Sequence, residues 1–324
     1  MKVLHIVPGV DDIANGMAVV ARFLAKEQGE AEVDDLNHGI HRIHGSSAEE
    51  VWIHGMWLPK EWLACWRTLR SGKRLVRMPH GSVDPVRLRY HGWKKWLVGP
   101  IERWCLRRCS KIVATCEAEA EWIRAYEPRV KSIEVTDIKR FFDLPSVPRS
   151  HPSSDRLRGS LRSGDTFPVP RPPHLLYLGR RHPLKGVEYL ETAVRQIQES
   201  SAPLRLCARI ISNAFGEEKE KVWDWCDVLV LPTLSENFGL VVAEALERGK
   251  SVITTDGAPA WNHGIHRIHG NGMGEVGNHE IHETHEKGLW SGYGGRLIYL
   301  KGYRDGTDEE RVELLKNAIE RIGK

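Results

Sequence analysis

Short apolar runs alternate along this chain with longer stretches whose apolar residues recur at helical spacing. The short runs predict buried strands at residues 2–7, 51–57, 75–81 and 111–116. The longer stretches predict helices at residues 17–27, 90–108 and 117–126. Strands that alternate with helices are typical of an α/β domain built on a parallel sheet. We therefore predict a doubly wound domain over residues 1–143.

The composition changes after this domain, and the alternation then resumes. Residues 144–173 carry seven prolines among many serines and charges, without periodicity, which predicts a linker. A second doubly wound domain is predicted over residues 174–324, with strands at 175–179, 204–211 and 227–231. Its last helix, residues 308–322, either packs across the junction between the domains or stays on the second domain.

The most informative local pattern is LVLPTLSENFGLVVAEALE, at residues 229–247. An apolar run ends at Pro232 and a helical run follows Gly239, so we predict a strand, a polar turn and a helix. The free N–H groups and the dipole at a helix start attract anions. Glu236 in the turn and Glu244 about one turn into the helix could then flank a phosphate ester.

Two kinds of charged residue suggest the ligand. Carboxylates are poor ligands for phosphate but accept hydrogen bonds from sugar hydroxyls, so Glu236 and Glu244 favour a nucleotide sugar. The alternative is an ordinary strand-helix unit in which Glu236 caps the helix and Glu244 is solvated. Arg180 and Lys185 follow a predicted strand and suit a diphosphate, because Arg offers a fork of donors and Lys a point charge. The alternative is two solvated cations in a turn.

Three segments resemble one protein family. SENFGLVVAEAL resembles the Glu-x7-Glu motif of retaining GT-B glycosyltransferases of the group 1, family 4 type. GRRHPLKG, at residues 179–186, is similar to the family's Gly-Arg…Lys-Gly motif, and TTDGAPAW, at residues 254–261, is similar to the loop that follows the two glutamates. The resemblance implies a GT-B architecture, with two Rossmann-like doubly wound domains facing across a cleft. The first domain would hold the acceptor and the second the nucleotide sugar.

The resemblance also implies roles for residues of the second domain. Arg180 and Lys185 would meet the donor phosphates. Glu236 would contact the donor-sugar hydroxyls, and Glu244 would hold the ribose. The backbone near the sugar and phosphate would come from Asn237, Phe238, Gly239 and Leu240. The sequence departs from the family at ISNAFGEEK, residues 211–219, which replaces a Gly-rich turn and bears on base recognition.

The first domain contributes three further candidates. Asn15-Gly16-Met17 resembles the family's Gly-rich loop, in which Gly16 would let the backbone approach acceptor and donor phosphate closely. His54 and His80 each close a predicted strand in a His-Gly pair. MPHGSVDP resembles the segment whose histidine lines the cleft near the donor sugar, so His80 is the stronger candidate. At both positions the alternative is a structural or surface histidine.

The resemblance implies transfer of a sugar from a nucleotide-diphosphate sugar to a glycan or lipid-linked acceptor, with retention of configuration. Small enzymes of this family commonly serve cell-surface polysaccharide or lipopolysaccharide biosynthesis. No residue is a secure nucleophile, so we expect a front-face route in which the leaving phosphate oxygen takes the acceptor's proton and His80 shapes the sugar site. The alternatives are a non-catalytic nucleotide-sugar-binding protein and a GT-B epimerase or phosphorylase.

Charge and hydropathy limit the partners and the cellular location that we expect for the protein. The 324 residues carry a net charge of +4, a mild basic excess that suits phosphate-bearing ligands or an anionic membrane surface. No nucleic-acid motif appears, so no nucleic-acid partner is expected. No stretch approaches the roughly 18 apolar residues of a spanning helix, and MKVLHIVPGV is interpreted as a buried strand rather than a signal peptide. A cytoplasmic protein with six reduced cysteines is predicted.

Residues 90–108 mix tryptophans with lysines and arginines on a predicted helix. In one interpretation the tryptophans are buried and the cations solvated. In the other, the helix docks on an anionic membrane, at the inner face of the plasma membrane.

The segment NHGIHRIHG occurs twice, at residues 37–45 and 262–270, and further histidines follow the second copy. Such spacings allow Zn²⁺ or Ni²⁺ to bind. A duplicated segment that forms a flexible surface loop is the preferred interpretation. No metal and no cofactor are expected for the activity, because the nucleotide sugar is itself a substrate.

Overall fold

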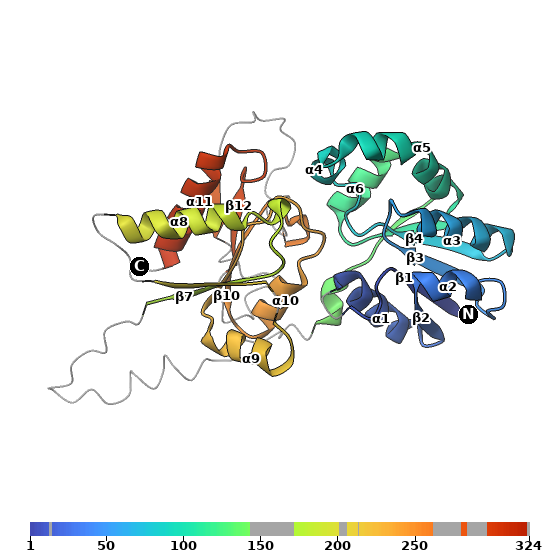
Figure 1. Ribbon diagram of the computed structural model, residues 1–324, viewed down its shortest axis with the longest axis horizontal. Coiled ribbons are helices and arrows are strands. Elements are labelled where there is room, and N and C mark those ends of the chain that lie inside the picture. The colour runs from blue at the N-terminus through green and yellow to red at the C-terminus, as the bar shows by residue number, and fades with distance from the viewer. Residues whose placement is uncertain are drawn as a thin grey trace. The chain divides into compact units, whose positions relative to one another are not determined.

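The computed structural model describes residues 1–12, 15–142, 172–200, 206–212, 214–261, 280–283 and 297–322. The chain divides into two compact units, Met1–Phe141 and Phe142–Lys324, each built from strands and helices in alternation (Figure 1). The predicted linker falls almost wholly outside the described residues.

The first unit is a parallel six-stranded sheet with strand order β2-β1-β3-β4-β5-β6. Its strands are β1 Val3–Val7, β2 Ala31–Asp35, β3 Glu50–His54, β4 Arg74–Met78, β5 Lys111–Ala114 and β6 Ile133–Val135. Its helices are α1 Gly16–Gln28, α2 Leu36–Arg42, α3 Pro59–Arg70, α4 Pro85–Arg89, α5 Gly92–Arg108 and α6 Glu117–Tyr126, followed by a 3₁₀ turn at Ile138–Phe141.

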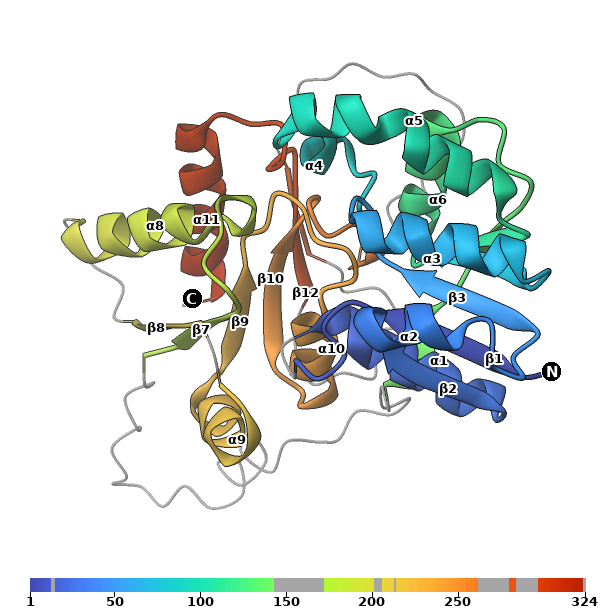
Figure 2. The same cartoon turned by 45° about the vertical axis from the view of Figure 1, so that its right-hand side comes forward.

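The second unit has strand order β11-β12-β10-β9-β7-β8, parallel except for β11. Its strands are β7 His174–Leu178, β8 Cys207–Ile211, β9 Val228–Leu231, β10 Ser251–Thr255, β11 Glu280–Glu283 and β12 Leu297–Lys301. Its helices are α8 Val187–Glu199, α9 Gly216–Trp225, α10 Leu240–Glu247 and α11 Asp308–Ile322, with 3₁₀ turns at Pro183–Lys185 and Pro259–Trp261. Helices α8 and α11 pack against each other over one face of the sheet (Figure 2).

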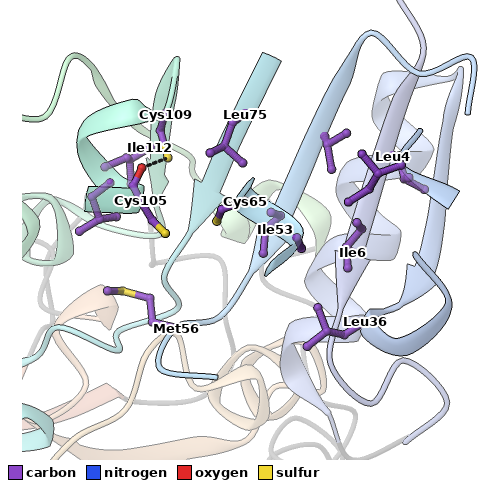
Figure 3. Packing of buried hydrophobic residues seen from close by; sticks show 14 of the residues in the cluster. Leu4, Ile6, Leu36, Ile53, Met56, Cys65, Leu75, Cys105, Cys109 and Ile112 are labelled. Carbon is purple, nitrogen blue, oxygen red and sulfur yellow. Dashed lines mark hydrogen bonds between the residues drawn. The ribbon is translucent and has the colours of Figure 1, made fainter. Parts of the chain in front are cut away.

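Alternation of side chains along the strands gives the sheet of the first unit two apolar faces. Leu4 and Ile6 of β1 join one core cluster with residues of α2, α3 and α5 (Figure 3). Val7, on the opposite side of β1, packs with Ala18 and Ala21 of α1. Helices on both faces of a parallel sheet define a doubly wound unit, as predicted.

The cysteines are free thiols, and all but Cys207 are buried. Cys65, Cys105 and Cys109 lie in the core of the first unit, where Cys109 Sγ donates to the carbonyl of Cys105 at 3.3 Å (Figure 3). All three pack in the core, and Cys65 Sγ also accepts a hydrogen bond from Arg77.

The helix predicted over residues 90–108 is confirmed: α5 spans Gly92–Arg108 without interruption, and His91, in a left-handed conformation (φ 55°), precedes its first residue. One local prediction was wrong. The first histidine-rich copy is not a surface loop: it forms α2, and Ile40 and Ile43 are buried in the core. A Cβ on Gly39 would lie 3.0 Å from the Ile6 side chain, so this helix packs closely on β1. The second copy lies outside the described residues.

Candidate functional site

In each sheet there are two neighbouring strands from which the chain continues toward opposite edges of the sheet. Ligands of doubly wound folds bind at the point between such strands, outside their carboxyl ends. In the second unit this point lies between β7 and β9. The loops after these strands are joined, because the Leu184 carbonyl accepts from Leu234 N at 2.9 Å and from Thr233 Oγ1 at 3.0 Å. The predicted motifs that follow β7 and β9 therefore meet.

Two glycines allow this close approach. Gly186 has φ 62°, and a Cβ there would lie 2.0 Å from the Pro232 carbonyl oxygen. A Cβ on Gly257, after β10, would lie 2.1 Å from the carbonyl oxygen of Thr233. No side chain fits at either distance, so both positions require glycine. Gly257 O also accepts from Glu236 N at 2.7 Å, which joins the third loop to the other two.

The joined loops bring Lys185 and Glu236 together. Lys185 Nζ forms an ion pair with Glu236 Oε2, and the two side chains are 20% and 19% exposed. Such a pair can exchange partners when a ligand arrives, because exposed ion pairs contribute little to stability. Arg180, at the end of β7, is exposed, and its carbonyl accepts from Tyr177 OH at 2.9 Å.

Helix α10 begins at Leu240, as predicted, next to these loops. Gly239 provides the turn into the helix with φ 72°. Phe238 is buried, and its carbonyl accepts a hydrogen bond from Trp261 Nε1. Asn237 N contacts Glu236 Oε1 at 3.1 Å. The first N–H groups of a helix have no partner within the helix, and those of α10 therefore suit an anion beside Lys185.

Glu244 has a partner that sequence analysis missed. Lys219 of α9 lies 2.9 Å from Glu244 Oε1 and 2.7 Å from Oε2, with Lys219 28% exposed and Glu244 24% exposed. Lys219 lies in a run of mixed charges, GEEKEK, that gives no sign of which residue faces α10. Glu244 is thus not simply a solvated carboxylate, as the alternative interpretation had it.

In the first unit the structure brings His54, the last residue of β3, into contact with His80, which follows β4. His54 Nδ1 lies 2.8 Å from His80 Nε2. His5 of β1, which sequence analysis did not select, lies 2.9 Å from His54 on the other side, and Gln28 Oε1 contacts His5 at 2.8 Å. The available signal was a lone polar residue within an apolar strand.

Burial keeps these imidazoles neutral. Loss of solvation lowers the pKa of His5 to about 4, against the opposing effect of its hydrogen bond to Gln28 Oε1. It lowers the pKa of His80 to about 3, with a further contribution from Arg87, and the pKa of His54 well below its usual range. At neutral pH each ring therefore carries one N–H and one acceptor nitrogen.

The loop that carries His80 is held by a buried carboxylate. His80 adopts a left-handed conformation (φ 54°), which is strained for a residue with a side chain. Glu119 accepts hydrogen bonds from Gly81 N at 2.5 Å and from Thr115 N at 2.7 Å. Burial raises the pKa of Glu119, and these bonds oppose that effect. The backbone next to His80 is thus fixed independently of its ring.

Gly16 is the first residue of α1, at the end of the loop after β1. Asn15 caps this helix by accepting from Met17 N at 3.1 Å. Its amide also donates to the carbonyls of Pro8 and Gly9, at 2.6 and 3.0 Å. The capping places Gly16 above the strand ends, and its contact with phosphate stays a prediction.

Helix α5 presents an exposed apolar face that we call the tryptophan face: Trp93, Trp96, Leu97 and Ile101. The side chains of Trp96 and Trp93 are 79% and 66% exposed. The interpretation in which the tryptophans of this segment are buried is therefore wrong for these two. Residues 85–108 carry seven lysines and arginines and one acid, Glu102, which is fully buried.

Two absences hold for the residues that the structure describes. They contain no group of three or more His, Cys, Asp or Glu side chains that could hold a metal ion. No helix among them is long and apolar enough to cross a membrane.

Two family models match the chain. Residues 15–136 match a glycosyl transferase 4-like domain, and residues 204–273 match glycosyl transferases group 1. The chain carries a glycosyltransferase domain in each unit. No curated protein matches it in sequence.

Solved glycosyltransferases share the fold. HepE from Anabaena, in complex with UDP and glucose, is 14% identical with a TM-score of 0.55, and the match covers 100% of this chain and 94% of HepE. WaaB, a lipopolysaccharide outer core galactosyltransferase, is 15% identical with a TM-score of 0.55, over 100% and 92% of the two chains. Sucrose-phosphate synthase from Thermosynechococcus elongatus is 14% identical with a TM-score of 0.53, over 79% and 81%. The predicted GT-B fold, with two Rossmann-like units, is confirmed.

Proposed function

We propose that this glycosyltransferase moves a sugar from a nucleotide-diphosphate sugar to a glycan or lipid-linked acceptor, with retention of configuration. The observation that carries the proposal is the Lys185–Glu236 ion pair at the point between β7 and β9, next to the start of α10. It gives one site a cation and helix N–H groups for phosphate and a carboxylate for sugar hydroxyls.

The proposed reaction proceeds on one face of the sugar. The bond between the anomeric carbon and the phosphate oxygen breaks, that oxygen takes the proton of the acceptor hydroxyl, and the acceptor oxygen bonds to the anomeric carbon. Lys185, Arg180 and the start of α10 stabilise the charge that develops on the leaving diphosphate. Glu236, released from Lys185 by the phosphate, accepts hydrogen bonds from sugar hydroxyls, while Glu244 meets the ribose.

The donor is tested by ligand-observed NMR with UDP-, GDP-, ADP- and TDP-sugars. One donor is expected to bind to the native protein and to bind several-fold more weakly to Glu244→Ala. Glu220→Ala, which removes a more exposed carboxylate of α9, is the matched control and should bind normally. UDP-glucose leads the panel because HepE was solved with UDP and glucose. If folded protein binds no donor, the proposal is wrong.

Product analysis separates transfer from the other two functions. Release of the nucleoside diphosphate only when an acceptor is added supports transfer. Conversion of the nucleotide sugar without any acceptor would indicate an epimerase. Binding without conversion or release, across glycan and lipid-linked acceptors, would indicate a non-catalytic protein. The galactosyltransferase activity in the name of WaaB makes lipopolysaccharide core oligosaccharides the first acceptors to try.

We also propose that the tryptophan face docks on an anionic membrane at the cytoplasmic side of the plasma membrane, where a lipid-linked acceptor would lie. Trp93, Leu97 and Ile101 follow one another at intervals of four residues and so share one side of α5. Exposed tryptophans favour the lipid interface, and neighbouring cations such as Lys94 favour anionic headgroups. No exposed acid in residues 85–108 opposes them.

Vesicle sedimentation tests this docking. The protein should bind vesicles that contain phosphatidylglycerol and should bind pure phosphatidylcholine much less. Trp96→Ser should weaken binding several-fold, while Phe215→Ser, which removes an exposed apolar side chain of the other unit, should not. Equal binding by Trp93→Ser/Trp96→Ser and the native protein would exclude the tryptophan face.

A further inference from the structure

Three histidines form a row across neighbouring strands of the first unit, from α1 to the loop after β4. The contacts run from Gln28 to His5, from His5 to His54 and from His54 to His80, with separations of 2.8, 2.9 and 2.8 Å. His5 lies opposite Trp52 in the pairing of β1 with β3. His54 is two residues further on, so both imidazoles project from the same face of the sheet. We call these four residues the histidine row.

The row allows two orders of protons. Each contact between two ring nitrogens needs one hydrogen, and each neutral imidazole has only one N–H. If His5 donates through Nε2, its Nδ1 must accept from His54 Nε2. His54 Nδ1 must then accept from His80 Nε2, which leaves His80 Nδ1 as an acceptor. If the first bond is reversed, every bond reverses and His80 Nδ1 becomes a donor.

The residue at the far end selects between the two orders. The Gln28 atom that contacts His5 is the carbonyl oxygen Oε1, which only accepts. With the amide in this orientation, the order is the one in which His5 donates and His80 Nδ1 accepts. The rings are 0% exposed for His5 and His54 and 5% exposed for His80, so water cannot easily replace a missing partner within the row.

We propose that Gln28 and His5 are positioning residues that fix the tautomer of His80 and thereby keep its Nδ1 an acceptor. They act on His80 only through His54. The consequence for activity rests on the proposed function together with the family resemblance, which implies that His80 lies near the donor sugar: an acceptor nitrogen there favours a sugar hydroxyl that donates. The tautomer itself is a property of the unliganded protein and does not depend on that function.

A row that only fills the core would need no such order. The other residues of β1 are Val3, Leu4, Ile6 and Val7, all buried and apolar, so an apolar residue could stand at position 5. A buried histidine is stabilising only when its hydrogen bonds are made, and this row makes them in one continuous sequence. The row reaches His80. Glu119 holds the backbone next to His80 separately, through Gly81 N.

The test records the imidazole nitrogens by NMR in protein labelled with ¹⁵N-histidine, with His80 assigned by the loss of its signals in His80→Gln. In the native protein, Nε2 of His80 should carry the proton. Gln28→Lys replaces the acceptor by a group that only donates, so the proton should move to Nδ1. Gln28→Glu, which only accepts, is the matched control and should keep the native tautomer. Gln28 is only partly buried, so both variants should fold.

An unchanged His80 tautomer in folded Gln28→Lys would overturn the proposal. Gln28→Met gives a second test, because loss of the carbonyl should yield signals of both tautomers, and a single native tautomer there would also contradict it. With UDP-glucose as the probe, Gln28→Lys should lower affinity or turnover about tenfold relative to Gln28→Glu, as expected for one mismatched hydrogen bond. A changed tautomer with unchanged transfer would uphold the row and refute the proposed contact of His80 with the sugar.

Discussion

The carboxyl ends of the strands differ between the two units. In the first unit the polar groups at these ends are buried: His54, Arg77 and Glu102 are 0% exposed and His80 is 5% exposed. In the second unit the pairs Lys185–Glu236 and Lys219–Glu244 retain between 19% and 28% of their side-chain surface. The first unit thus encloses titratable groups among fixed partners. In the second unit buried polar residues near these ends, such as Thr233 and Thr255, are uncharged, and the charged pairs are partly exposed.

The difference indicates different tasks. A buried polar group must keep its hydrogen bonds, since losing one costs the full penalty of desolvation. Such groups hold one arrangement and can orient a histidine. A partly exposed ion pair is worth little to stability and can open when a phosphate competes for its cation. The comparison predicts that substitutions in the first unit act mainly on stability and those in the second mainly on turnover.

The largest effect is expected for Arg77→Met. Arg77 donates to the Gly55 carbonyl at 2.6 Å and to Cys65 Sγ at 2.9 Å, and Glu102 lies 3.5 Å away, with both charged side chains fully buried. Removal of the cation leaves Glu102 without its charge partner, so the free energy of unfolding should fall by about 3–5 kcal/mol in urea denaturation. Adding Glu102→Gln should restore part of that loss. A single variant as stable as the double variant would show that the buried pair does not behave as a unit.

The second-largest effect that we expect is a loss of turnover. Lys185→Ala should lower turnover about 10²–10³-fold, because it removes a preorganised cation from the leaving diphosphate. Its free energy of unfolding should change by less than about 1 kcal/mol, since the Lys185–Glu236 pair is partly exposed. Lys221→Ala, which removes an exposed cation of α9, is the control. Normal turnover in Lys185→Ala would remove Lys185 from the mechanism and break the contrast between the units.

Part of the fold could be predicted from the sequence. The apolar runs located seven of the strands but missed β2, β6, β10, β11 and β12. Parallel strands bring their carboxyl ends to one edge, so the motifs after β7 and β9 were expected at the same edge of the sheet. The partners of two key residues could not be predicted. His5 meets His54 across 49 residues of sequence, and Lys219 meets Glu244 across 25, which depends on sheet order and helix rotation.

Local geometry accounts for the wrong prediction in the first unit. The first histidine-rich segment looked like a polar loop, but Ile40 and Ile43 are three residues apart and so lie on one side of a helix. Burial against Ile6 outweighs the polar composition. A pattern of two apolar residues is too short to be decisive in a sequence.

The stability of the first unit should depend on pH. Burial raises the pKa of Glu61 to about 7 despite the opposing charge of Arg77. The folded state then holds a proton that the unfolded state has lost, so stability falls as the pH rises from about 4.5 to 7, by about 3 kcal/mol. The lowered pKa values of His5 and His80 act with the opposite sign: their contribution is present above pH 6.5 and is lost as the pH falls toward 4 and 3.

Glu61→Gln should therefore remove the loss of stability that accompanies a rise in pH, and it should leave the opposite contribution of the histidines unchanged. Urea unfolding of both proteins at pH 5.5 and pH 8 measures this, and the comparison uses the change between the two pH values, which cancels any constant effect of the substitution. The native protein should lose stability relative to the variant by about 1–3 kcal/mol over this interval. Equal changes in the two proteins would mean that Glu61 is ionised in the folded state throughout.

The smallest effect is expected for Lys219→Met. The Lys219–Glu244 pair is about a quarter exposed, so its loss should change the free energy of unfolding by less than about 1 kcal/mol. An ionised carboxylate has about four acceptor positions, and Lys219 leaves some of them for ribose hydroxyls while it holds the side chain in place. Positioning should therefore outweigh competition, and the KM for the donor should rise about two- to fivefold with unchanged kcat. Lys219→Arg should retain most of the affinity. A fall in KM would instead mean that Lys219 competes with the donor for Glu244, and the exposed pairs of the second unit would then act as barriers that the ligand must displace.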